Sequence, residues 1–205
     1  MNSNLHDASR FYFDVMLRNG VPSEETREQA KAVFNSLLKI EDYAIMTELT
    51  RQKEEVSFSS AEIPQYSSLF DCFLLVDKLI RSGLNGISYS QAGFLLRISQ
   101  RKRDTDCKYG KNHAKCASLM GLCLVENGKV WRNSFTYAHE MLDDSIKESL
   151  MPKLCRGIKV IRGYFQHNES DIFIHNAMSC LSESTQKRRS HNIIRLINVV
   201  KESII

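Results

Sequence analysis

The sequence predicts a mostly α-helical protein with one small β-hairpin, built as an N-terminal helical domain followed by two helix-turn-helix units. Apolar residues recur at helical spacing through most of the 205 residues. The strongest strand signal is the turn Asn127-Gly128, which lies between two short apolar segments. The composition, 42% hydrophobic and 25% charged with 9 Gly and 3 Pro, excludes disordered and collagen-like classes.

Residues 1–67 are expected to form an acidic helical domain that contacts protein. One helix is predicted before Gly20, and a second after Ser23, whose side chain can cap it. The second helix carries an apolar stripe formed by Ala30, Val33, Phe34, Leu37 and Leu38. Such a stripe needs a partner, either a neighbouring helix or a second copy of the chain. The Ser-rich residues 57–67, which include Pro64, are expected to be a linker.

Residues 68–149 are expected to form a winged helix-turn-helix. A first helix is predicted from Leu69 to near Gly83, and a second after the capping box of Ser88 and Gln91. The basic stretch 101–111 is expected to be a loop that leads into a third helix over 112–122. A hairpin around Asn127-Gly128 follows, and three helices before a hairpin are typical of a winged helix.

Residues 150–205 are expected to form a second helix-turn-helix without a wing. Three helices are predicted, the second capped by Asn168 or Ser170 and the third by Ser184. The last helix carries the apolar stripe Ile193, Ile197, Val200 and Ile204.

Charge is distributed unevenly, and this distribution indicates the partner of each part. Residues 1–67 hold 7 Lys and Arg against 11 Asp and Glu, whereas residues 68–205 hold 21 against 13. The basic part is therefore expected to bind duplex DNA. In the first unit the candidate contacts are Arg101, Lys102, Arg103, Lys108, Tyr109, Lys111, Asn112, Lys115 and Ser118, with Lys129 and Arg132 on the wing. In the second unit they are Gln186, Lys187, Arg188, Arg189 and Asn192.

The two sets of candidates have different expected roles. Gln186, Arg189 and Asn192 are spaced by three residues, so they are expected to share an exposed helix face that contacts base edges. Lys187 and Arg188 are better placed for phosphates. The alternative is a solvated basic surface, or winged helices that bind protein, as in an adaptor of an ATPase-associated complex.

Two segments carry a resemblance to a known family. The run from Arg103 to Phe135, with Met120-Gly121-Leu122 where the family has LGL, resembles winged-helix modules of bacterial restriction endonucleases and related defence proteins. The S-T-x-x-R-R pattern of Ser184 to Arg189 is similar to helices of the same proteins. The resemblance covers about a quarter of the chain. It implies sequence-specific binding of duplex DNA in a restriction or defence setting, and does not imply a nuclease in this chain.

No catalytic residue, metal or cofactor is expected. The D-x-K element Asp106-Cys107-Lys108 lacks an acidic partner on a preceding strand, which leaves a restriction-type nuclease as a minor alternative. Zinc ligation by Cys107, His113, Cys116 and Cys123 lacks the usual close cysteine pair. No apolar run can span a membrane and no signal peptide is recognised, so the expected location is the cytoplasm.

Overall fold

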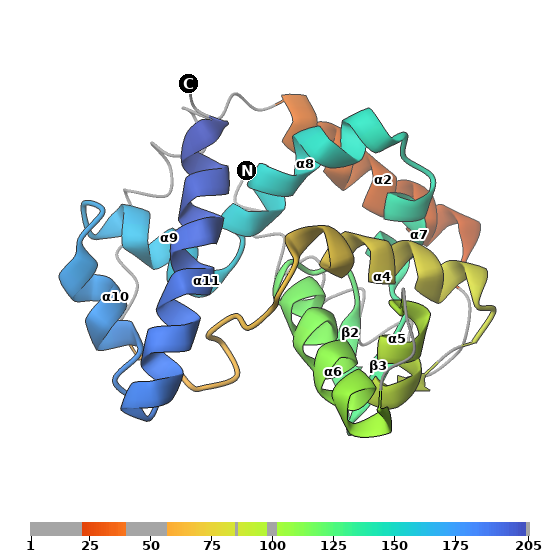
Figure 1. Cartoon of the computed structure of the whole chain (residues 1–205). Coiled ribbons are helices and arrows are strands. Elements are labelled where there is room, and N and C mark those ends of the chain that lie inside the picture. The colour runs from red at the N-terminus through yellow and green to blue at the C-terminus, as the bar shows by residue number, and fades with distance from the viewer. Residues whose placement is uncertain (1–21, 40–56, 85, 98–101, 204–205) are drawn as a thin grey trace.

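The computed structural model describes residues 22–39, 57–84, 86–97 and 102–203 (Figure 1). Within these residues nine helices accompany a three-stranded antiparallel sheet, which confirms the mostly helical class. The elements are α2 (Glu24–Lys39), α4 (Leu69–Arg81), β1 (Ile87–Ser88), α5 (Tyr89–Leu95), α6 (Arg103–Leu119), β2 (Leu124–Glu126), β3 (Lys129–Trp131), α7 (Ser134–Glu140), α8 (Asp144–Arg156), α9 (Lys159–Gln166), α10 (Asp171–Ala177) and α11 (Glu183–Glu202). The helix predicted before Gly20 and the candidate Arg101 lie outside the described residues.

The short-range signals for the middle unit are confirmed. Ser88 and Gln91 form a reciprocal capping box at the start of α5. Asn127 and Gly128 both have positive φ, 49° and 74°, and they join β2 to β3 as the sequence predicts. The sheet has the order β1-β3-β2, with Ile87 opposite Val130 on β3. The short strand β1 thus joins the hairpin, a pairing that the sequence analysis did not include.

The expectation that residues 101–111 form a loop is wrong for residues 103–111, because α6 begins at Arg103. Two glycines explain how this polar helix packs closely against α5. A Cβ atom at Gly110 would lie 2.1 Å from the carbonyl oxygen of Tyr89, and one at Gly93 would lie 1.9 Å from that of Asp106. The backbones of α5 and α6 therefore meet where neither helix has a side chain, and this contact fixes the position of α6.

Residues 57–66, called the strap below, have no helix or strand, as predicted for a linker, yet they are packed against the C-terminal helices. Ile63 and Tyr66 are buried. The Tyr66 hydroxyl donates to the carbonyl of Asn192 at 3.1 Å, and the Phe58 ring meets the edge of Phe173 with centroids 5.9 Å apart. The sequence missed these contacts because they join residues more than 100 positions apart.

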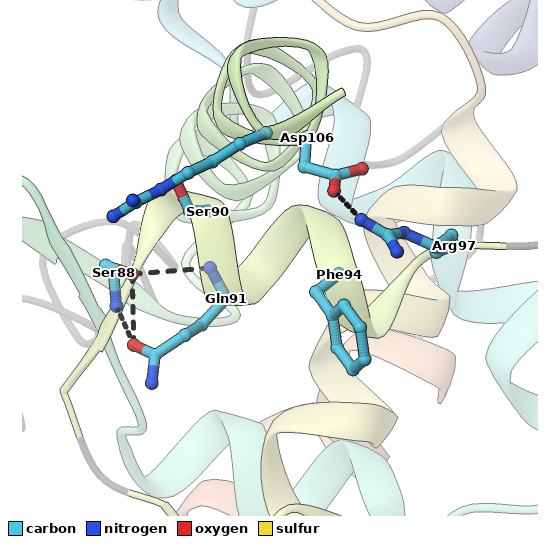
Figure 2. Close-up of a pocket in the computed structure, with 7 residues that line it drawn as sticks. Ser88, Ser90, Gln91, Phe94, Arg97 and Asp106 are labelled. Carbon is cyan, nitrogen blue, oxygen red and sulfur yellow. Dashed lines mark hydrogen bonds and ion pairs between the residues drawn. The ribbon is translucent and has the colours of Figure 1, made fainter. Parts of the chain in front are cut away.

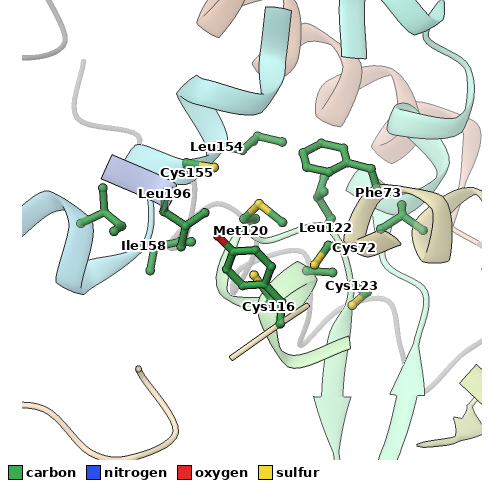
Figure 3. Packing of buried hydrophobic residues seen from close by; sticks show 14 of the residues in the cluster. Cys72, Phe73, Cys116, Met120, Leu122, Cys123, Leu154, Cys155, Ile158 and Leu196 are labelled. Atoms are coloured by element: carbon green, nitrogen blue, oxygen red, sulfur yellow. The ribbon is translucent and has the colours of Figure 1, made fainter. Parts of the chain in front are cut away.

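One buried cluster extends through the described parts of all three predicted domains. Figure 3 shows its centre, where Cys72 of α4, Cys155 of α8 and Leu196 of α11 come together with Met120, the residue that follows α6. The α2 stripe packs within the same chain, since Phe34 is fully buried and its ring centroid lies 5.1 Å from that of Phe135. The division into separate domains stays a prediction.

Replacing Gly110 by Ala should destabilise the protein by about 3 kcal/mol or more, because the new methyl group clashes with backbone atoms of α5 that cannot rotate away. Urea unfolding measures this loss. Gly128→Ala is the control, because nothing lies within 4 Å of its Cβ position and only its positive φ opposes the change, at about 1–2 kcal/mol. Equal losses for the two variants would contradict the close approach of α5 and α6.

Replacing Phe34 by Ala should lower the free energy of unfolding of the whole chain by about 3–5 kcal/mol, because α2 shares the common core. The measurement is urea unfolding followed both by circular dichroism and by the fluorescence of Trp131. We expect one transition that shifts equally with both probes. Two separate transitions, with that of Trp131 unmoved, would show that residues 1–67 fold independently.

Candidate nucleic-acid interface

The outer face of α6 carries a basic stripe, called the α6 stripe below, made of Lys108, Lys111, Lys115 and Ser118. These residues alternate at spacings of three and four, so they follow one side of the helix. Lys108 and Lys111 are exposed, and Lys115 and Ser118 are half-buried. The opposite side of the helix is buried through Asp106, Gly110, His113 and Ala117. The structure thus presents these four predicted residues together on one surface.

His113 fixes α6 against the start of α4. Its ring is buried, and Nδ1–H donates to the carbonyl of Tyr109 at 2.8 Å. Nε2 then accepts from the backbone N–H groups of Ser67 and Ser68, at 3.4 and 3.3 Å. Both nitrogens are therefore used when the imidazole is neutral, and the histidine holds the helix in place.

Tyr109 was expected to contact DNA, but its hydroxyl donates to the carboxylate of Asp71 on α4. Its ring also lies beside His113, with centroids 4.1 Å apart. The side chain is half-buried and directed to α4, so its role in the structure is to hold α6 against α4, and its contact with DNA stays a prediction. Asn112 is half-buried beside the α6 stripe.

The basic residues of α6 and α11 lie close enough to affect one another. Burial lowers the pKa of Lys115, and the positive charges of Lys111 and Arg189 lower it further. Arg189 belongs to the first half of α11. Arg189 of the second candidate group therefore lies near Lys111 and Lys115 of the first.

The predicted outward face of α11 is only partly present. Asn192 is 6% exposed, so the expectation that it faces outward with Arg189 is wrong. Nη1 of Arg189 donates to the carbonyls of Ser60 and Ile63, at 2.6 and 2.9 Å, and Gln186 donates to the carbonyl of Leu181 at 2.8 Å. The strap therefore lies against this side of α11. Helical spacing in the sequence could not predict this contact, because the strap is not helical. Lys187 and Arg188 remain exposed.

The remaining candidates differ in their exposure to solvent. Lys102 and Arg103 are exposed at the start of α6, and Lys129 is exposed beside the hairpin turn. Arg132 is half-buried, with its guanidinium 5.4 Å from the ring centre of Tyr137 on α7. Its aromatic contact places it at the base of the hairpin and away from the turn.

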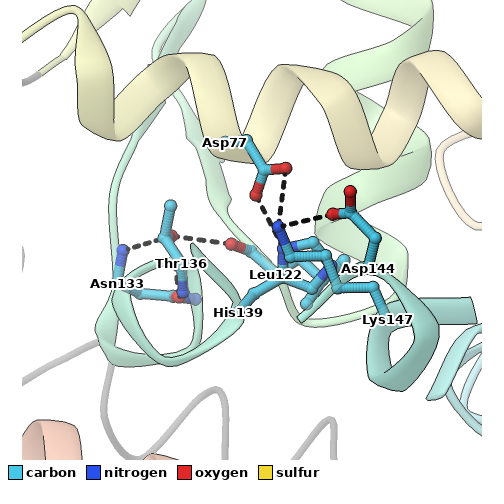
Figure 4. Close-up of polar contacts among 7 residues, drawn as sticks. All are labelled: Asp77, Leu122, Asn133, Thr136, His139, Asp144 and Lys147. Atoms are coloured by element: carbon cyan, nitrogen blue, oxygen red, sulfur yellow. Dashed lines mark hydrogen bonds and ion pairs between the residues drawn. The ribbon is translucent and has the colours of Figure 1, made fainter. Parts of the chain in front are cut away.

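A buried polar network lies elsewhere and joins α4, α7 and α8 (Figure 4). The Asp77 carboxylate contacts Nδ1 of His139 at 3.1 Å and Nζ of Lys147 at 3.0 Å. Burial would raise the pKa of Asp77, but the hydrogen bonds from His139 and Lys147 outweigh it, so the pKa lies below its ordinary value. The network therefore stabilises the packing of three helices.

The cysteines of the zinc hypothesis have other surroundings. Cys116 and Cys123 are fully enclosed in the apolar cluster (Figure 3), and burial raises the pKa of the Cys123 thiol. His113 uses both ring nitrogens as described above. Among the residues that the structure describes, no group of three or more His, Cys, Asp or Glu side chains is arranged to hold a metal ion.

Over the described ranges, no helix has both the length and the apolar character needed to cross a membrane. Comparison with known protein families, with curated proteins and with solved structures finds no match to this chain.

Replacing Asp77 by Asn should destabilise the protein by about 3 kcal/mol at pH 7, because Lys147 and His139 lose their half-buried charged partner. Since the pKa of Asp77 is lower in the folded state, its stabilisation is complete above the unfolded value near 3.9 and is lost as the pH falls through the folded value. The stability difference between wild type and variant should therefore shrink below about pH 4. Urea unfolding between pH 7 and pH 3 measures it.

Asp144→Asn is the matched control for this experiment. Asp144 also lies near Lys147, at 3.7 Å, but its side chain is 97% exposed. Water screens that pair, so the control should unfold almost as the wild type does at every pH. A difference for Asp77→Asn that stays constant across the range would show that the Asp77 charge does not carry the stabilisation.

Proposed function

We propose that the chain binds duplex DNA without catalysis, through the α6 stripe and the exposed basic start of α11. The observation that carries the proposal is the α6 stripe itself, in which three lysines and a serine line the side of α6 opposite its buried face. Lysines spaced along one helix side match the repeated phosphates of a duplex.

The order of elements supports the same function. The chain runs α4, β1, α5, α6, β2, β3, and the sheet order β1-β3-β2 brings the first strand against the hairpin. We interpret this part as a winged helix, in which α6 takes the position of the helix that enters the major groove. In this interpretation the hairpin, with Lys129 beside its turn, is the wing.

The side chains divide into two proposed roles. Lys108, Lys111, Lys187 and Arg188 have flexible charged ends that suit phosphates, and their contacts carry no sequence information. Asn112 and Ser118 lie on α6 near Lys108 and Lys111, and their short neutral side chains suit base edges. Arg189 is bonded to the strap, so we propose that it positions the strap and that base recognition depends on α6.

The setting of this activity follows the resemblance described from the sequence. We propose an accessory or specificity subunit of a bacterial restriction, defence or regulatory complex, located in the cytoplasm. Residues 1–67, with 7 basic and 11 acidic side chains, would bind a protein partner or a second copy.

Replacing Lys111 and Lys115 together by Ala should weaken binding to all duplexes to a similar degree, because phosphate contacts are lost. The measurement is fluorescence anisotropy of labelled duplexes at several salt concentrations. The slope of log affinity against log salt should fall by about 0.9 for each phosphate contact that is lost. Selection of bound sequences from random duplex DNA with the wild-type chain then measures specificity.

The matched control is the double variant Lys31→Ala and Lys39→Ala, which removes the same charge from α2. Its salt slope should stay close to that of the wild type. Equal effects of the two double variants would mean that net charge alone drives binding. Absence of salt-dependent duplex binding by the folded wild type would reject the proposal in favour of a winged helix that contacts protein.

A further inference from the structure

A surface cleft of about 560 Å³ lies between α5 and the start of α6 (Figure 2). Its lining includes Ser90, Phe94, Arg97, Arg103 and Asp106, so an aromatic ring, two guanidinium groups, a hydroxyl and a carboxylate surround one space. The volume falls within the range of small-molecule sites. None of these residues belongs to the α6 stripe.

Asp106 marks this cleft as more than a surface depression. Its side chain is only 4% exposed, and one carboxylate oxygen, Oδ2, pairs with the guanidinium of Arg97. The other oxygen, Oδ1, is buried and has no hydrogen-bond partner among the described residues. A buried carboxylate oxygen without a donor is costly, and a ligand hydroxyl or N–H group that reaches it would remove that cost.

The rest of the lining indicates what such a ligand carries. Phe94 is 61% exposed, an unusual position for a phenylalanine, and Arg97 lies 4.8 Å from its ring centre. An exposed ring beside a guanidinium can stack on a flat heterocycle. Arg103 is exposed and lies three residues before Asp106 on α6, and its guanidinium can pair with an anionic group of a ligand.

We propose that this cleft binds a ribonucleotide, with its base on Phe94, its phosphate on Arg103 and its ribose beside Asp106. A small rotation of the Asp106 side chain would uncover the buried Oδ1, which then accepts a hydrogen bond from a ribose hydroxyl. The nucleotide is either a free molecule or the unpaired end of an RNA strand, since the recognised chemistry is the same. This site is separate from the α6 stripe, and the proposal does not rest on duplex DNA binding.

The test is isothermal titration calorimetry of the full chain with adenosine 5′-monophosphate. Saturable binding is expected, and Phe94→Ala should weaken it about fivefold or more. The 2′,3′-dideoxy form of the same nucleotide keeps base and phosphate but lacks the ribose hydroxyls, so the wild type should bind it about fivefold more weakly. With Arg103→Ala the monophosphate should bind no better than adenosine.

Matched controls distinguish binding in the cleft from nonspecific binding to exposed aromatic or basic side chains. Phe70→Ala removes a ring that is 66% exposed on α4, and Arg81→Ala removes an exposed arginine from the end of the same helix. Both should bind the monophosphate as the wild type does. A 12-nucleotide RNA that binds more tightly than the monophosphate, and loses affinity with Phe94→Ala, would identify the strand end as the source.

Three results would overturn the proposal. These are no saturable binding of any nucleotide, equal binding of inorganic phosphate and the monophosphate, or equal losses for Phe94→Ala and Phe70→Ala. Failure of duplex binding in the anisotropy experiment leaves these measurements unaffected, because they use a different ligand and different residues.

Discussion

The contact between Gly93 and Gly110 is the constraint on which the orientation of α6 depends. At this crossing the two backbones approach to distances that no side chain allows, since a Cβ at Gly110 would lie 2.4 Å from the nitrogen of Gly93. Glycine weakens a helix interior by about 1 kcal/mol, so its presence inside α6 needs a packing reason, and the crossing supplies one. With one side of α6 pressed on α5, the lysines on the other side face outward.

Buried polar groups complete the positioning of α6. His113 and Tyr109 connect it to the beginning of α4, and Asp106 connects it to Arg97 beyond α5. Such bonds are directional, whereas apolar packing tolerates small rotations. These bonds therefore hold α6 at one rotation about its axis. The same residues of α6 then always face the solvent.

The sequence predicted elements whose signals are local and failed where contacts are distant. The capping box of Ser88 and the turn at Asn127-Gly128 depend on neighbouring residues, and both were correctly placed. The start of α6 was misplaced because its buried side is polar and lacks the apolar period of a typical helix. Helical spacing alone put Asn192 on the same exposed face as Arg189. The sequence does not show that the strap packs beside α11, so the burial of Asn192 was not predicted.

The basic region holds like charges close together in the free protein. Burial lowers the pKa of Lys115, and the positive charges of Lys111 and Arg189 lower it further, so this arrangement of like charges has an electrostatic cost. Lys187 and Arg188 lie in the first turns of α11, where the helix dipole also opposes positive charge. Neither arrangement stabilises the fold. A polyanion bound across α6 and α11 would offset both costs. Each phosphate would attract the basic side chains and screen the repulsion between them. The same charges that weaken the isolated protein would then contribute to the binding that we propose.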